Sequence, residues 1–476
     1  MLLRRAWTAA WPALGFFAIL LVVSLPQGLD SLVSIVGVPV TSNSDQLADA
    51  FGYRDSGSML KAAISIYDNG RLIGDFFWVF NLWPPGMVVV DVVLLHIEAV
   101  TGVPLGVLMV VLNAVIWAAL LGAVFVVVRR RRGLAIAGVF ALAALLYSGV
   151  SSWGANLGLF YSDSFGAIAF SAALLLLFLA AEQTSWKPRL ARAVWAGALL
   201  AAAAYFRATF ELVNNVLFVL AIAFVAVLLV LRLVRRRGLA SSALWLVSLP
   251  LAVSGTVYMV LTLPWRLYAA RSIRTGDLRW SVVSDLVSGD RWAPDSALTG
   301  DAGFLLDGHS NWACHLDLDE CRRIAALENA TEAPYSGGVG GYFSNAEFDH
   351  LTVQAVLEHP LQFLAERFSM LTLGFASSTG QLVGVMAVGE SLVLATLLAL
   401  LVFAFIRRGG FRNPGFVFLA LATTLQFATL AGFHMESRYF LGIELSLLVM
   451  GALIVGPPWG RFARPPLAAV SQPPPT

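Results

Sequence analysis

Apolar runs of about 20 residues recur along the chain, and short polar segments separate them. A run of this length forms an α-helix that crosses the roughly 30 Å hydrocarbon core of a bilayer. We predict ten such spans, at residues 11–27, 104–128, 133–150, 164–181, 193–209, 212–231, 241–263, 384–406, 414–433 and 438–456. The pattern therefore predicts an all-α polytopic membrane protein.

An eleventh apolar stretch, residues 86–101, contains three ionisable side chains, Asp91, His96 and Glu98. A charged side chain at the centre of a membrane helix costs about 2.5–3.5 kcal/mol on insertion scales. We therefore predict that this stretch is an interfacial helix on the outer leaflet and not an eleventh span.

The composition agrees with a membrane protein, because 58% of the 476 residues are hydrophobic and 13% are charged. Soluble chains carry about 25% charged residues. The mean hydropathy is +0.78. These values exclude a soluble enzyme, a disordered chain and a nucleic-acid-binding protein. The chain has 2 lysines against 29 arginines, a bias typical of a GC-rich bacterial genome.

Basic residues cluster in the short loops and at the chain ends, where Glu182 is the only acid. The clusters are Arg4 with Arg5, residues 129–132, Lys187 with Arg189 and Arg192, Arg232 with residues 235–237, Arg407 with Arg408 and Arg412, and Arg461 with Arg464. Short loops rich in Lys and Arg stay in the cytoplasm. We therefore place both termini in the cytoplasm and residues 28–103 and 264–383 on the periplasmic side of the plasma membrane.

This topology divides the chain into four regions. They are an N-terminal transmembrane module at 1–263 that includes the first external loop at 28–103, an extracytoplasmic region at 264–383, C-terminal transmembrane helices at 384–456, and a disordered cytoplasmic tail at 457–476. The only cysteines, Cys314 and Cys321, lie in the extracytoplasmic region, where an oxidising compartment favours a disulfide. The alternative is a zinc site that adds His315, although no fourth ligand occurs at typical spacing.

The first external loop holds Asp45 and Asp55 and then a pattern typical of a helix over residues 56–66. The apolar face of that helix contains Met59, Ala62, Ala63 and Ile66. This start places Asp55 at the helix N-cap, Gly70 ends the helix, and the WPPG segment at 83–86 forms a rigid turn. A carboxylate held rigidly at the membrane surface suits a general base in group transfer. A solvated acidic loop is the alternative interpretation.

Asp55, the helical face, Gly70 and the WPPG segment together resemble the first-loop signature of the GT-C glycosyltransferase superfamily, particularly its protein O-mannosyltransferase and aminoarabinose transferase members. Those proteins often carry a second acid after the first, where this chain has Ser56. The resemblance implies an inverting enzyme that moves a sugar from a polyprenyl-phosphate donor to an envelope glycan, lipid or protein. It implies Asp55 as the catalytic base, with Asp163 or Asp45 as the second carboxylate.

Asp163 stands at the outer mouth of the span at 164–181. A helix N-cap, worth about 1 kcal/mol, explains this position equally well. Arg207 and Glu211 follow at the next outer junction. Their four-residue spacing predicts an i, i+4 ion pair on a continuous helix. Because polar groups near membrane depth are costly, lining a cavity is the alternative role for this pair.

The segment GFHMESRYF, at 432–440, resembles the E-x-R-Y segment of GT-C enzymes. A guanidinium there can grip the donor phosphate through paired hydrogen bonds. The expected donor-phosphate residues are Arg438, Arg207, Arg266, His434 and Tyr439, and the expected substrate-binding residues are Trp83, Glu211 and Glu436. Interfacial snorkelling is the alternative for Arg438 and Tyr439, and pairing with lipid headgroups is the alternative for Arg266.

This scheme requires no cofactor, because arginine can neutralise the leaving phosphate. A divalent metal held by Asp55 with Asp45 or Asp163 is possible in principle but lacks support. The expected partners are the lipid-linked donor, the envelope acceptor and membrane lipids, with no nucleic acid. The alternative functions are a flippase or transporter of lipid-linked glycans and a non-catalytic GT-C-like scaffold. The chain has no Walker phosphate loop and no HExxH motif.

Overall fold

The computed structural model describes residues 10–22, 54–70, 80, 84–150, 162–183, 185–235, 243–272, 357, 360–361, 414–431 and 441–454. Every regular element in these ranges is an α-helix. The helices are Ala10–Val22, α3 (Arg54–Asn69), α5 (Gly86–Thr101), α6 (Leu105–Arg132), α7 (Leu134–Val150), α9 (Ser162–Ala181), α10 (Trp186–Phe206), α11 (Ala208–Arg235), α12 (Ala243–Ser272), α21 (Pro414–Ala431) and α22 (Leu441–Ile454). The predicted all-α fold is confirmed for this part of the chain.

Three of the described helical segments are long and apolar enough to cross a membrane, and the chain is a polytopic membrane protein. They are α6, α9 and the segment Thr209–Val227 of α11. The predicted spans within the described residues coincide with helices, except that the span at 193–209 runs past the end of α10 at Phe206 into the start of α11. The predicted span at 384–406 lies outside those residues, as does the end of the span at 11–27.

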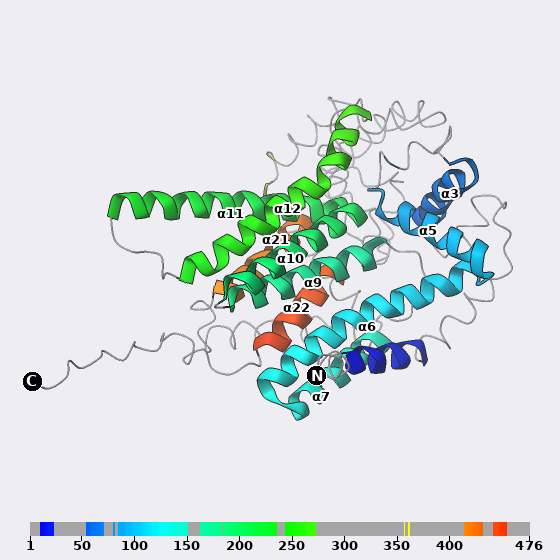
Figure 1. Cartoon of the computed structure of the whole chain (residues 1–476), viewed down its shortest axis with the longest axis horizontal. Coiled ribbons are helices and arrows are strands. Elements are labelled where there is room, and N and C mark those ends of the chain that lie inside the picture. The colour runs from blue at the N-terminus through cyan, green and yellow to red at the C-terminus, as the bar shows by residue number, and fades with distance from the viewer. Residues whose placement is uncertain are drawn as a thin grey trace, which may run out of the picture.

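Helix α9 occupies the centre of the bundle and is buried along most of its length. It packs against α10, α22, α21 and α6, and α10 in turn packs against α12 (Figure 1). Helices α10 and α12 approach closely at Gly197, where an added Cβ would collide with the Ser254 carbonyl oxygen. Small residues permit such close packing between membrane helices, where the hydrophobic effect gives little drive for association.

Several helices extend beyond the apolar runs that predicted them. Helix α12 continues through Pro264 to Ser272, although the predicted span ended at residue 263. A proline removes one backbone hydrogen bond, but membrane helices tolerate it where neighbours satisfy the freed groups. Helix α10 begins at Trp186, ahead of the predicted start at residue 193. Hydropathy therefore marks the hydrocarbon-crossing part of a helix, which is shorter than the helix itself.

The basic residues 129–132 and the turn between α9 and α10 meet at one end of the bundle. Arg131, at the end of α6, forms an ion pair with Glu182. Arg192 Nη1 donates a hydrogen bond to the Leu179 carbonyl oxygen at 2.8 Å. The two loops therefore meet at the same end of the bundle, as a shared location on one side of the membrane requires.

Helices α3 and α5 pack against each other at the opposite end of α6 from residues 129–132 (Figure 1). The predicted bounds of the interfacial helix, 86–101, are the bounds of α5. Its buried residues are Met87, Val88, Asp91, Leu94 and Leu95, and an exposed apolar stripe contains Val89, Val93, Ile97 and Val100. The exposed stripe gives α5 a lipid-compatible face, as an interfacial helix requires.

Asp91 is buried inside the protein, although it belongs to a helix predicted to lie at the membrane surface. The side chain is fully buried, and neither carboxylate oxygen has a hydrogen-bond partner in the part of the chain that the structure describes. Burial raises the pKa of Asp91 well above its ordinary value. The apolar face of α3 covers this side of α5, which hydropathy along the sequence could not show.

We predict that Asp91→Asn stabilises the protein, and by more as the pH rises. The folded state holds the Asp91 proton to a higher pH than the unfolded state, so wild-type stability falls between the unfolded pKa of about 4 and the raised folded pKa. Within that window the variant should gain up to about 1.4 kcal/mol for each pH unit. Thermal unfolding at pH 5 and pH 8 measures the effect. Glu98→Gln on the same helix is the control, and an equal gain from both variants would contradict the assignment to Asp91.

Candidate active site

Arg207 interrupts the helical path between α10 and α11. Helix α10 ends at Phe206 and α11 begins at Ala208, while Arg207 has extended backbone angles of φ −148° and ψ 130°. Its N–H still donates to the Ala203 carbonyl oxygen at 3.0 Å, and its carbonyl oxygen accepts from the Phe210 N–H at 3.2 Å. The predicted ion pair between Arg207 and Glu211 on a continuous helix is therefore wrong.

Arg207 instead forms a two-point ion pair with Asp163 in the first turn of α9. Arg207 Nε donates to Asp163 Oδ1 at 2.5 Å, and Nη2 donates to Oδ2 at 2.9 Å. The two residues are 7% and 5% exposed. Helix α9 begins at Ser162, so Asp163 lies inside the helix and is not its N-cap. The pair fixes the start of α9 to the junction between α10 and α11.

Glu211 pairs with Arg266 of α12, one turn of α11 beyond the junction. Arg266 Nη2 lies 3.1 Å from Glu211 Oε1 and donates to Asn215 Oδ1 and the Tyr258 hydroxyl, each at 2.6 Å. Arg266 Nε donates to the Thr262 hydroxyl at 3.1 Å. The guanidinium also lies over the Tyr258 ring, with Cζ 5.2 Å from the centroid. Arg266 is thus held in one orientation by four neighbours.

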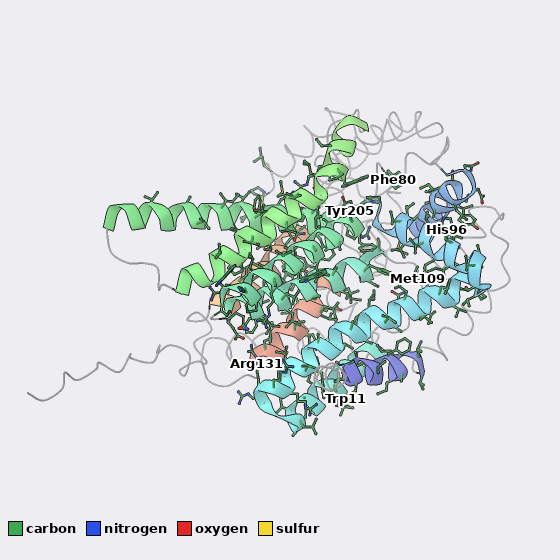
Figure 2. All side chains as sticks on the ribbon, in the orientation of Figure 1. Trp11, Phe80, His96, Met109, Arg131 and Tyr205 are labelled. Atoms are coloured by element: carbon green, nitrogen blue, oxygen red, sulfur yellow. The ribbon has the colours of Figure 1, made fainter. Side chains whose placement is uncertain are left out.

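Phe80 and Gly86 of the first external loop lie at the end of the bundle that holds Arg207 and Arg266. Gly86 packs against Tyr205, and an added Cβ would lie 2.5 Å from the Tyr205 carbonyl oxygen. Phe80 contacts Trp265 with ring centroids 6.3 Å apart. Figure 2 shows Phe80 and Tyr205 near each other, with Arg131 at the far end of α6. Close backbone approach therefore requires glycine at position 86.

Two further contacts complete the arrangement. Phe165 of α9 stacks on Phe206 at a centroid distance of 5.1 Å, and the Tyr205 hydroxyl donates to the Leu261 carbonyl oxygen at 2.8 Å. These contacts join α9, α10 and α12 at the same end. The α3–α5 unit shares its apolar cluster with Phe165. Helices α3 and α5 of the first loop therefore pack at the end of the bundle that holds Asp163, Arg207, Glu211 and Arg266.

Helix α22 also begins at this end of the bundle. An added Cβ at Gly442 would lie 2.8 Å from Gln426 Oε1 of α21 and 3.0 Å from Cζ of the Phe210 ring of α11. Glu444, one turn along the helix from Leu441, is 6% exposed. In the sequence, Leu441 follows Arg438 by three residues.

The structure brings together Asp163, Arg207, Glu211 and Arg266 among the predicted site residues. Asp55 lies in the first turn of α3, which begins at Arg54, so the backbone differs from the predicted N-cap position. The side chain of Asp55 lies outside the described part of the chain. So do the predicted site residues Asp45, Trp83, Cys314, Cys321, His434, Glu436, Arg438 and Tyr439.

Sequence reasoning missed Tyr258 and Asn215, which hold Arg266 in place. Both are polar residues inside long apolar runs, and such residues in membrane helices usually face the protein interior. That signal could have selected them, but it could not have named their partner. Tyr258 lies two helical turns before Arg266 on α12, and Asn215 comes from α11.

Within the described residues, no group of three or more His, Cys, Asp or Glu side chains could hold a metal ion. No protein-family model and no curated protein matches the chain. Its structure is similar to a crystal structure of ArnT from Cupriavidus metallidurans bound to undecaprenyl phosphate, with 16% identity, a TM-score of 0.39, and coverage of 93% of this chain and 78% of that chain. The apo state of the same protein gives a TM-score of 0.36 at the same identity and coverage.

Proposed function

We propose that this protein is an inverting membrane glycosyltransferase that moves a sugar from a polyprenyl-phosphate donor to an acceptor hydroxyl of the cell envelope. The reaction takes place on the outer face of the plasma membrane, with both termini in the cytoplasm. The observation that carries the proposal is the packing of the first-loop residue Gly86 against the junction that holds Arg207. This contact supports a site in which the Asp55 loop and fixed cationic groups act on one substrate.

In the proposed reaction, the Asp55 carboxylate accepts the proton of the acceptor hydroxyl as its oxygen attacks the anomeric carbon. A new glycosidic bond forms while the bond between the anomeric carbon and the phosphate oxygen breaks. The polyprenyl phosphate leaves with the bonding electrons, and arginine neutralises its charge. A single displacement inverts the anomeric centre. No metal enters this scheme.

Arg266 is the described residue best arranged to receive the donor phosphate. Its Nε and Nη2 are occupied by protein acceptors, whereas Nη1 makes no hydrogen bond within the described residues. The side chain is 23% exposed. A guanidinium held in this way can bind a phosphate oxygen without losing further side-chain freedom. We place Arg438 beside it as a second phosphate ligand.

Asp163 and Arg207 have a positioning role in this proposal. Each engages the other through two hydrogen bonds, so the pair holds the α10–α11 junction against the start of α9. The junction in turn supports Gly86 and the turn that precedes α5. Glu211 and the residues Trp83 and Glu436 then contact the acceptor or the sugar.

We predict that Arg266→Gln weakens donor binding roughly 10-fold to 100-fold, because one charge-assisted hydrogen bond is worth about 1.5–3 kcal/mol. The apparent donor affinity in a transfer assay measures the effect. Arg266→Lys should recover part of the loss, since it keeps the charge opposite Glu211 but not the fork of donors. Arg129→Gln is the control, because Arg129 is exposed in the last turn of α6, away from the proposed site. Unchanged donor affinity in Arg266→Gln would remove this residue from the site.

The function itself is tested by incubating the purified protein with polyprenyl-phosphate sugars and an envelope extract. Undecaprenyl phosphate, the lipid bound in the ArnT structure, is a suitable carrier. Mass spectrometry should detect the glycosylated product together with the released carrier phosphate. Movement of intact lipid-linked glycan between leaflets, without transfer, would establish the flippase instead.

A further inference from the structure

Seven basic side chains gather at the end of α6 and the start of α10, far from the proposed active site. They are Arg129, Arg130, Arg131, Arg132, Lys187, Arg189 and Arg192. Glu182 is the one carboxylate among the described residues of these helix ends. We name these seven residues the basic cluster, and it carries a net excess of positive charge.

Part of the basic cluster serves the protein itself. Arg131 pairs with Glu182 and lies 4.9 Å from the centroid of the Phe178 ring. Arg189 and Arg192 donate hydrogen bonds to the carbonyl oxygens of Gln183 and Leu179, at the end of α9. Cations placed at a helix C-terminus satisfy its last carbonyl groups and its dipole.

The remaining charge of the basic cluster faces outward. Arg129, Arg130 and Lys187 are exposed and make no ion pair within the described part of the chain. The positive charge of Arg130 also acts unfavourably on Arg192. An external anion near Arg130 would relieve this repulsion, because like charges at short range are destabilising unless a counter-charge compensates them.

An exposed apolar stripe begins at the same level. Trp186, Leu190 and Val194 recur at intervals of four residues along α10 and are 65%, 39% and 41% exposed. Residues at this spacing lie above one another on a single helix face. Lys187 Nζ lies 5.9 Å from the centroid of the Trp186 ring, so the cationic and apolar parts of this surface adjoin.

We propose that the basic cluster and this stripe form a binding site for an anionic glycerophospholipid of the leaflet at this end of the bundle. The phosphate lies between Lys187 and Arg130, and an acyl chain follows Trp186, Leu190 and Val194. A zwitterionic lipid brings no net charge to offset the cluster, whereas an anionic headgroup does. An acidic protein would match the charges but would leave the apolar stripe, which runs into the membrane, uncovered.

The chain supplies a matched pair of variants, because its two lysines lie at opposite ends of the structure. Lys187 belongs to the basic cluster, and Lys61 lies on α3. The experiment titrates phosphatidylglycerol into the delipidated full chain in detergent and counts bound lipid by native mass spectrometry. Lys187→Gln should weaken the retention of phosphatidylglycerol about 5-fold, because each basic residue near a lipid surface contributes about a 5-fold factor. The double variant Lys187→Gln with Arg130→Gln should weaken it about 25-fold. Lys61→Gln should retain phosphatidylglycerol as the wild type does.

Other outcomes overturn the proposal. Equal retention by the wild type and the double variant, or equal losses in Lys61→Gln and Lys187→Gln, would show that the lipid does not bind at the basic cluster. Equal retention of phosphatidylcholine would show that the contact is a general annular one. Displacement of phosphatidylglycerol by equimolar undecaprenyl phosphate would assign the surface to the polyprenyl carrier. Unchanged thermal unfolding midpoints show that the variants remain folded.

Discussion

Replacing Arg207 with alanine is expected to lower the unfolding free energy by about 3–5 kcal/mol, the usual cost of breaking a buried ion pair by removing one partner. The substitution deletes both guanidinium hydrogen bonds to Asp163, whose side chain is 6% exposed. It also frees the backbone junction that supports Gly86. Chemical or thermal unfolding in detergent measures the loss, and transfer activity should fall with it.

Two comparisons separate this effect from a general loss of positive charge. Arg131→Ala removes the more exposed pair with Glu182, whose side chains are 17% and 27% exposed, and should cost about 1 kcal/mol or less. The double variant Asp163→Ala with Arg207→Ala should be more stable than Arg207→Ala alone, because it removes the carboxylate as well as its partner. A double variant whose loss equals the sum of the two single losses would contradict a direct coupling between the residues.

The sequence predicted the ends of helices well where a proline or a glycine marks them. The bounds of α5 follow from Pro85 at its start and from Gly102 after its end, where φ is +69°. Glycine adopts this left-handed conformation without strain, so it terminates helices reliably. Gly70 closes α3 in the same way, at φ +65°. These signals are carried by one or two residues and need no tertiary information.

Pairing between distant residues could not be predicted in the same way. The four-residue spacing of Arg207 and Glu211 suggested a local pair, but their partners, Asp163 and Arg266, are 44 and 55 residues away in the chain. The extended backbone at Arg207 accompanies its ion pair with Asp163. A local rule on charge spacing assumes a continuous helix, and the break at Arg207 removes its premise.

Asp91 shows the same limit of sequence-based prediction, because its burial depends on contacts with other helices. The cost of a charge in hydrocarbon argued against a span at 86–101, yet it could not show that this carboxylate is buried against other helices. Its position in the register matches Met87, Leu94 and Leu95, which are buried under α3. A helix needs an apolar stripe of sufficient width, and here Asp91 occupies one position of that stripe. The packing of α3, α6 and α10 decides which stripe of α5 faces the protein.

The gathering of Asp163, Arg207, Glu211 and Arg266 at one end has a consequence for the choice between transferase and transporter. Transporter sites lie near the bilayer midplane and are often built on broken helices. The break at Arg207 occurs at the end of α10, where the first loop also packs. In the proposed topology, the partly exposed Arg266 and Glu211 at this level can meet a lipid phosphate at the membrane surface and a water-borne acceptor. With this end of α10 at the outer interface, as proposed, the arrangement fits the proposed transferase better than a transporter.

The second large effect is expected from Asp55→Asn, which should reduce the transfer rate about 10²-fold to 10⁴-fold, the usual contribution of a general base. Asparagine has nearly the same shape as aspartate but cannot accept the proton of the acceptor hydroxyl. Donor affinity and the unfolding midpoint should therefore stay at wild-type values. Rates measured at saturating donor and acceptor isolate the chemical step from binding.

The matched control is Asp68→Asn, which makes the same chemical change on the same helix. Asp68 is exposed near the end of α3, 13 residues beyond Asp55, or about 20 Å along the helix axis. This variant should transfer sugar at the wild-type rate. A general electrostatic effect of α3 would slow both variants alike, whereas a base at Asp55 slows only one. Full activity of Asp55→Asn would show that Asp55 is not the base. Glu211, which pairs with Arg266, would then be the next carboxylate to test.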